Sequence, residues 1–198
     1  IGFEARKSEY VDAKSGVSAR MSITAYENLY STAERRLLIT QDDKTSIRMT
    51  DFLGIIPAIN GKIELVYEGE QEGANEVSFH LISMSIKTLF PKYFPKIEKL
   101  EKPNEVGPYD EILEWFFKDN ELFLEDDLNE KEYCKTLDDL PGLSKIVKKH
   151  LTDLDEKDRY FMMEFLLWGL ESYQKLNKLR RLEGIYFKDS LGSFINRL

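Results

Sequence analysis

The stretch Ser15–Arg36, SGVSARMSITAYENLYSTAERR, decides how the sequence is read, because it predicts an amphipathic helix that starts at Ser18. Apolar residues recur along it at the 3.6-residue period of one helix face: Ile23, Tyr26, Tyr30, Ala33 and Leu37. Ser18 is the predicted N-cap, and Thr24 with Glu27 has the spacing of a capping box and marks an alternative start. A long helix near the N-terminus is therefore the first element of the predicted fold.

Arg20 falls in the first turn of this helix. The N–H groups of a first turn are unpaired and carry partial positive charge, so acidic residues are favoured there and cations are not. Two interpretations follow. Either the arginine points into water, or its charge and the helix end together hold an anion such as phosphate.

Composition narrows the class of protein. The chain has 198 residues, 42% of them hydrophobic, which is enough for a real core. It contains no apolar run of bilayer length and no secretory leader, and its only cysteine is Cys134, so we expect a soluble, cytoplasmic protein without disulfides. The formal net charge of −8 argues against nucleic acid as the main partner.

Periodicity predicts a mainly α fold, at most with a short extended segment near 62–67. Further helices are expected at Phe3–Ala13, around Phe52–Ile59 with a kink at Pro57, at 74–88, 109–118, 128–134, 143–151, 155–182 and 190–198. Gly61 ends the second apolar stripe, and Glu68–Gly73 is too polar and glycine-rich for regular structure. In the helix 74–88, Val77, Leu81, Met84 and Ile86 are expected to face inward.

Four prolines place a linker at residues 91–108, between a helical domain at 1–90 and a second small helical bundle at 109–198. The aromatic residues of the second half sit at helical spacing and are predicted to be core: Trp115, Phe116, Phe117, Phe161, Phe165 and Trp168. The basic residues Lys175, Lys178, Arg180 and Arg181 are interpreted as a solvated face of the helix 155–182.

Self-contained catalytic sets are not found. Asn60-Gly61-Lys62 resembles the end of a P-loop, but Ile56 and Ile63 replace the required glycine and hydroxyl residues. His80 and His150 are isolated, so neither a zinc site nor a triad is predicted. The acidic residues Glu64, Glu68, Glu70 and Glu72 could bind a divalent cation or an arginine of a neighbouring subunit, or form a solvated loop.

The run SGVSARMSITAYENLYSTAERR resembles the start of the helical lid domain in AAA+ ATPases of the MoxR and magnesium-chelatase subunit I type. Residues Asp51–Gly73, DFLGIIPAINGKIELVYEGEQEG, and Glu164–Leu176, EFLLWGLESYQKL, are similar to the continuation and the C-terminal extension of bacterial magnesium-chelatase-like ATPases. In such lids a Ser-x-Arg at the start of a helix supplies the sensor 2 arginine. Here that motif is Ser18-Ala19-Arg20.

The resemblance implies that the chain is the lid and C-terminal extension of a longer, ring-forming ATPase whose P-loop and magnesium-binding motif lie on an upstream AAA+ core. ATP and magnesium would then be bound by the full-length protein, Arg20 would contact the ATP phosphates with Ser18 beside it, and this chain alone would not hydrolyse ATP. Arg35 and Arg36 match no family role and are expected on the surface. The alternative is a helical protein-interaction module with no nucleotide role, and Glu68, Glu70 and Glu72 are the interaction candidates.

Overall fold

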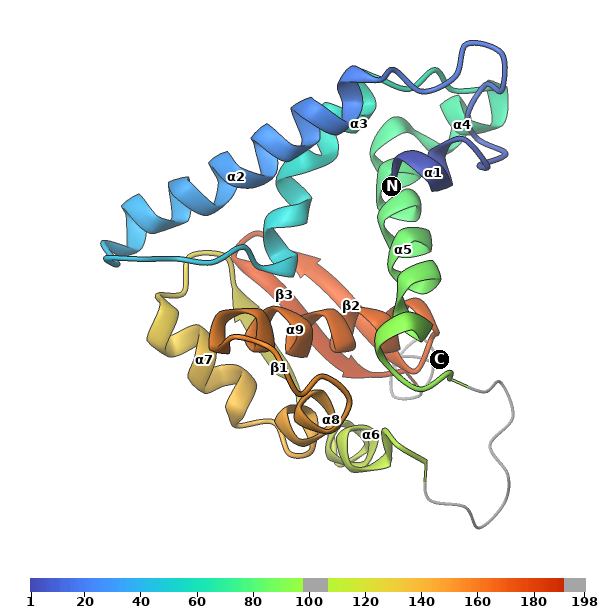
Figure 1. Cartoon of the computed structure of the whole chain (residues 1–198). Coiled ribbons are helices and arrows are strands. Elements are labelled where there is room, and N and C mark those ends of the chain that lie inside the picture. The colour runs from blue at the N-terminus through green and yellow to red at the C-terminus, as the bar shows by residue number, and fades with distance from the viewer. Residues whose placement is uncertain (98–106, 191–198) are drawn as a thin grey trace.

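The computed structural model describes residues 1–97 and 107–190 (Figure 1). Within these ranges the helices are α1 Gly2–Ala5, α2 Arg20–Thr40, the 3-10 helix η1 Met49–Ile55, α3 Ile56–Asn60, α4 Tyr67–Glu72, α5 Ala74–Tyr93, α6 Asp110–Phe117, α7 Glu130–Asp138, α8 Leu143–His150 and α9 Glu156–Ser172. Three strands complete the fold: β1 Leu122–Glu125, β2 Leu176–Arg181 and β3 Gly184–Asp189. The predicted mainly α class is confirmed, and a small antiparallel sheet adds to it.

Helix α2 packs on η1 and α3 through a face other than the predicted one. Met21, Ala33 and Arg36 are buried, and Ala25 and Leu29 pack against the core. Ile23, Tyr26 and Tyr30, by contrast, are 63%, 64% and 53% exposed. Of the predicted apolar stripe, only Ala33 is therefore fully buried, because the i, i+4 series from Met21 to Ala33 forms the contact instead.

The first half contains two further corrections. The helix predicted at Phe3–Ala13 ends at Ala5, and Val11 and Val17 instead form single bridges with Leu65 and Ile63. These bridges confirm a short extended segment near 62–67. Glu68–Gly73 is not irregular, since its residues form α4, which starts at Tyr67.

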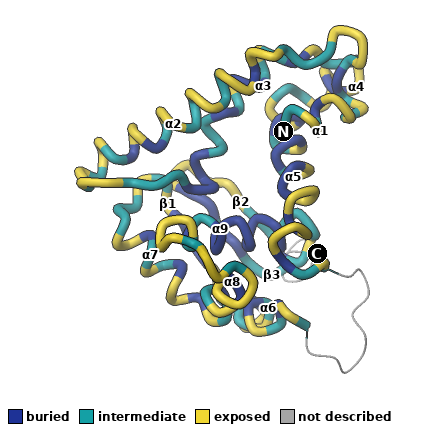
Figure 2. Tube along the Cα trace, viewed as in Figure 1, coloured by how far each residue is buried: buried dark blue, intermediate teal, exposed yellow. Residues whose placement is uncertain are grey.

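Helices α5 and α9 bring the two halves of the chain together. Gly169 of α9 lies against Phe90 of α5, so closely that an added Cβ would stand 2.0 Å from the ring. Helix α9 is buried over most of its length, as the dark tube in Figure 2 shows. Val77, Leu81 and Ile86 of α5 are buried as predicted, whereas Met84 is exposed. Helix α5 continues through Pro91, and part of the predicted linker lies at residues 98–106, outside the described ranges.

The predicted helix at 155–182 is wrong beyond Ser172. Gln174 adopts a left-handed conformation with φ 62°, and the chain then turns into the hairpin of β2 and β3. Strand β3 is central and also pairs with β1, in the order β1-β3-β2 (Figure 1). The predicted helix at 190–198 lies outside the described residues apart from Ser190.

Candidate functional site

Arg20 is the first residue of α2 and is exposed to solvent. The first turn contains no acidic residue, and within the described residues the guanidinium takes part in no ion pair and no hydrogen bond. The N-cap position is Ala19 rather than the predicted Ser18, because the helix starts one residue later than expected. Arg20 is thus a cation presented outward at the start of the longest helix of the described structure.

Ser18 organises the backbone at this helix end. Its Oγ accepts a hydrogen bond from the Arg20 N–H at 3.3 Å, and its carbonyl oxygen accepts one from the Met21 N–H at 2.9 Å. The Ser18 N–H in turn donates to the carbonyl of Lys62 at 3.1 Å. Since Ser18 occupies two first-turn amides, an anion at this end would interact mainly with the Arg20 side chain.

The three predicted interaction residues Glu68, Glu70 and Glu72 are all exposed on α4. Glu68 and Glu72 line a surface cavity together with Glu9, Tyr10 and Gln71, whereas Glu70 does not line it. No group of three or more His, Cys, Asp or Glu side chains in the described ranges is arranged to hold a metal ion. The structure therefore separates Glu70 from the other two.

A buried carboxylate, Glu164, lies at the junction of the two halves of the chain and was not predicted. Its Oε2 accepts hydrogen bonds from the Met49 N–H at 2.9 Å and the Tyr133 hydroxyl at 2.8 Å. Its Oε1 accepts from the Thr50 N–H at 3.0 Å and the Trp168 indole at 3.3 Å. Glu164 on α9 therefore accepts hydrogen bonds from the first two N–H groups of η1. No side chain of η1 itself provides an acceptor for them.

Two buried arginines extend this network. Arg36 of α2 pairs with Asp51 of η1 at 2.7 Å and also donates to Thr45 and to the Ser46 carbonyl. The Asp51 carboxylate accepts the Arg48 N–H at 2.7 Å as well. The prediction that Arg36 lies on the surface is wrong, since its side chain is 2% exposed.

Arg48 carries the network to α7. Its guanidinium lies 4.0 Å from the centre of the Tyr133 ring and donates to the Leu128 carbonyl at 2.8 Å and to Glu130 at 3.1 Å. Arg35, by contrast, is 63% exposed, as predicted, and pairs with Asp127 at 3.2 Å. The Glu164 network, meaning Arg36, Arg48, Asp51, Tyr133 and Glu164, thus connects α2, η1, α7 and α9.

The side chains of the Glu164 network stabilise the fold. Burial raises the pKa of Glu164 to about 7, and its hydrogen bonds with Tyr133 and Met49 oppose that rise. Burial, reinforced by Glu164, raises the pKa of Tyr133 far above its usual value. Because four donors occupy the carboxylate and all five side chains are within the interior or next to it, the network holds elements together rather than contacting a substrate.

A signal for this network is present in the sequence. Glu164 is the only charged residue in the run Tyr160–Leu170, YFMMEFLLWGL, and a carboxylate in such a run must find internal donors. Arg36 follows the buried i, i+4 series of α2 by three residues, at a position facing the core. What the sequence alone does not provide is the partner of each, since Met49 and Glu164 are far apart in the chain.

The other candidates have structural surroundings. The rings of His80 and Tyr10 form a T-shaped contact with their centres 5.7 Å apart, and His150 is exposed at the end of α8. Burial raises the pKa of Cys134 to about 11, so its thiol is protonated and a weak nucleophile at neutral pH. Of the predicted aromatic core, Phe116, Phe165 and Trp168 are buried, whereas Phe117 is 70% exposed.

The predicted basic helix face is instead part of a strand. Lys178 and Arg180 belong to β2, where alternate residues share one side of the sheet. Lys178 pairs with Glu171 at 3.0 Å, and Arg180 pairs with Asp126 at 2.6 Å. These contacts neutralise the two cations within the chain.

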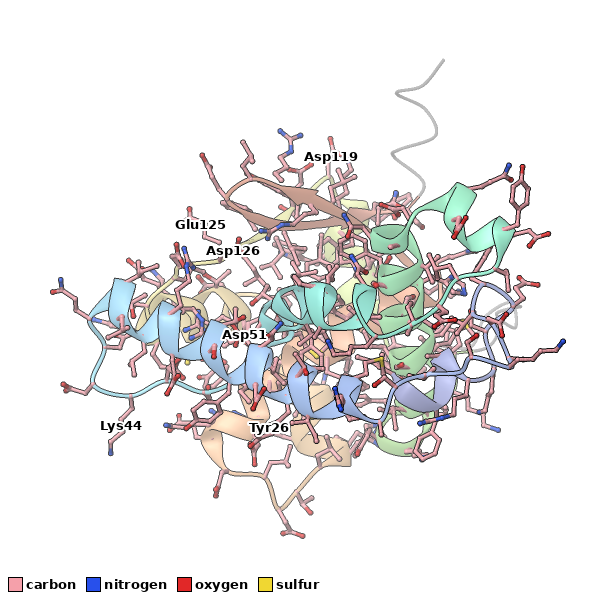
Figure 3. All side chains as sticks on the ribbon, turned by 90° about the horizontal axis from the view of Figure 1, so that it is seen from above. Tyr26, Lys44, Asp51, Asp119, Glu125 and Asp126 are labelled. Atoms are coloured by element: carbon pink, nitrogen blue, oxygen red, sulfur yellow. The ribbon has the colours of Figure 1, made fainter. Side chains whose placement is uncertain are left out.

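Two neighbouring cavities lie beside this strand and share Leu53 and Arg180. The larger, of about 470 Å³, is lined by η1, α4, α5, α9 and the β2–β3 hairpin. The smaller, of about 260 Å³, lies between α2, η1 and the turn after β1. Asp51 and Asp126, labelled in Figure 3, reach the smaller cavity from η1 and from that turn. Arg35, Arg36 and Arg180 each pair with an aspartate there, so its walls are balanced in charge.

Within the described ranges no helix combines the length and the apolar character needed to cross a membrane. The chain matches no protein-family profile, no curated protein and no solved structure.

Proposed function

We propose that this chain is the nucleotide-sensing lid and partner-binding C-terminal region of a MoxR or magnesium-chelatase-like AAA+ ATPase. The observation that carries the proposal is the exposed Arg20 guanidinium at the start of α2, within the motif Ser18-Ala19-Arg20. A cation at this end of a helix is unfavourable for the isolated chain, and a phosphate brought to it by another domain removes that cost. Arg20 is therefore assigned to the ATP phosphates.

The structure supplies a path from this arginine to the rest of the chain. Helix α2 runs from Arg20 to Thr40, a length of about 30 Å at 1.5 Å per residue. Arg36, near its far end, is fixed to Asp51, and η1 is fixed to α9 by Glu164. A displacement of the Arg20 end on nucleotide binding would move α2, η1 and α9 as connected parts.

The ATP and magnesium of the proposed enzyme would be bound chiefly by an upstream AAA+ core, because the chain contains no P-loop of the required sequence. From this chain, Arg20 would contribute charge to the phosphate oxygens, and Ser18 would keep the helix end in place. Electrostatic stabilisation of the transferring phosphoryl group is the chemistry that such an arginine adds. The full-length protein is proposed to be cytoplasmic, to assemble into rings and to act on a protein partner.

The alternative is a helical interaction module without a nucleotide role. It is favoured by the exposed stripe of Ile23, Tyr26 and Tyr30 on α2, where the two tyrosine rings stack with centres 6.4 Å apart. Exposed apolar side chains that lie together on one face are typical of contact surfaces. In this alternative, Arg20 is the polar end of that surface.

Two observations separate these functions. If the ATPase proposal is right, the amino-acid sequence encoded upstream of residue 1 should contain a P-loop that follows a strand pattern. Absence of a P-loop from that sequence would favour the interaction module. ATP hydrolysis by the full-length protein tests Arg20 directly. Unchanged turnover and unchanged nucleotide affinity in Arg20→Ala would overturn the assignment.

A further inference from the structure

The larger of the two cavities, of about 470 Å³, has a mixed lining in which apolar side chains lie beside acidic and basic ones. The apolar side chains come from η1, α5, α9 and β3: Leu53, Phe79, Ile82, Trp168 and Ile185. A cavity of this size accommodates one aromatic or a pair of aliphatic side chains of a bound segment. We call it the α5 groove.

The cations of the α5 groove are already paired within the chain. The Lys178 ammonium lies 3.7 Å from the Trp168 ring centre and 3.0 Å from Glu171, and burial lowers the pKa of Lys178. Arg180 makes two hydrogen bonds to Asp126. A bound anion would have to compete with these carboxylates for each cation.

The acids of the groove are not paired. Glu72 and Glu76 line it and are exposed, and within residues 1–97 and 107–190 their side chains form no ion pair and no hydrogen bond. Glu72 also lines the neighbouring cavity that contains Glu9 and Glu68. The unbalanced charge beside the apolar side chains of the groove is therefore negative.

We propose that the α5 groove binds a segment of a partner protein in which an apolar anchor is flanked by arginine or lysine. The anchor would enter between Leu53 and Phe79, and the basic residues would reach Glu72 and Glu76 on the rim. Unpaired carboxylates disfavour phosphate-bearing partners, which leaves a basic polypeptide as the complementary occupant. This inference specifies the partner-binding part of the proposed function and is independent of the nucleotide role of Arg20.

The test uses the whole chain and a labelled peptide of about ten residues, with two arginines around one phenylalanine and one leucine. Two matched peptides replace the arginines by glutamates or the apolar residues by serines. The protein variants are Glu72→Gln/Glu76→Gln and, as a control with the same charge change on exposed residues of α2 away from the groove, Glu27→Gln/Glu34→Gln. Fluorescence anisotropy measures each dissociation constant.

We expect saturable binding of the arginine-containing apolar peptide and none of the two matched peptides. Glu72→Gln/Glu76→Gln should raise the dissociation constant about 5- to 10-fold, the effect of losing two exposed charge pairs, and the control should raise it less than about 2-fold. Raising salt should weaken this binding further. Equal affinity in both double variants, or no saturable binding below about 1 mM, would overturn the proposal. The proposal would also be overturned if the chain alone formed a dimer that Glu72→Gln/Glu76→Gln abolishes. The occupant of the groove would then be a second copy of the chain. Because no nucleotide is present, failure here is distinct from failure of the Arg20 assignment.

Discussion

Glu164→Ala tests the junction between the two halves of the chain. The substitution removes the acceptor of the Met49 and Thr50 N–H groups and of the Tyr133 hydroxyl, in an interior where Glu164 is 0% exposed. Each stranded donor costs about 1–3 kcal/mol, and breaking a buried polar network as a whole costs about 3–5 kcal/mol. We therefore expect the free energy of unfolding to fall by about 3–5 kcal/mol.

Urea unfolding followed by circular dichroism measures this change. The matched control is Glu156→Ala on the same helix. The Glu156 side chain is exposed and pairs with Arg159, and its loss should cost less than about 0.5 kcal/mol. If Glu164→Ala does not fold, Glu164→Gln keeps one acceptor and should lose about 2–3 kcal/mol. A loss below about 1 kcal/mol with an unchanged denaturant slope would refute the role given to Glu164.

Further predictions concern pH and packing. Because the folded pKa of Glu164 lies at about 7, above its usual 4.5, the folded state holds a proton that the unfolded state releases. The free energy of unfolding of the native chain, compared with that of Glu164→Gln, should therefore fall as pH rises from 4.5 to about 7. We expect this fall to be at most about 3 kcal/mol. A difference between the two proteins that stays constant across this pH window in unfolding titrations would contradict the prediction. Gly169→Ala should destabilise the fold by about 1–3 kcal/mol, since its Cβ would meet the Phe90 ring. Phe90→Leu should reduce the effect of Gly169→Ala in thermal unfolding, whereas additive losses would show that the two sites do not interact.

The local parts of the fold could be predicted from the sequence. The start of α2 near Ser18, the end of α3 at Gly61 and helices α6 and α8 follow from apolar period and breakers. The hairpin of β2 and β3 could not, because Leu176–Arg181 is rich in lysine, arginine and leucine, which favour helices. Its pairing with β1 is a contact between residues distant in sequence, which local preference does not encode.

The candidate site divides in the same way. Arg20 could be identified from its motif and from its position in a helix, and both are local properties. The roles of Arg36 and Glu164 depend on residues elsewhere in the chain, so neither could be predicted without the packing of α2 on η1 and of η1 on α9. The face of α2 that is buried likewise depends on these neighbours, so the exposure of Tyr26 and Tyr30 does not follow from the apolar period alone.

The most direct test of the proposed function is the ATP turnover of the full-length protein with Arg20→Ala, measured beside Arg6→Ala. Arg6 is also an exposed arginine near the N-terminus of the described chain, but its guanidinium donates to the Gly2 carbonyl and has no proposed ligand. We predict that Arg20→Ala lowers turnover at least about 10-fold while Arg6→Ala leaves it unchanged. Equal turnover and equal nucleotide affinity in the native protein and Arg20→Ala would contradict the proposal.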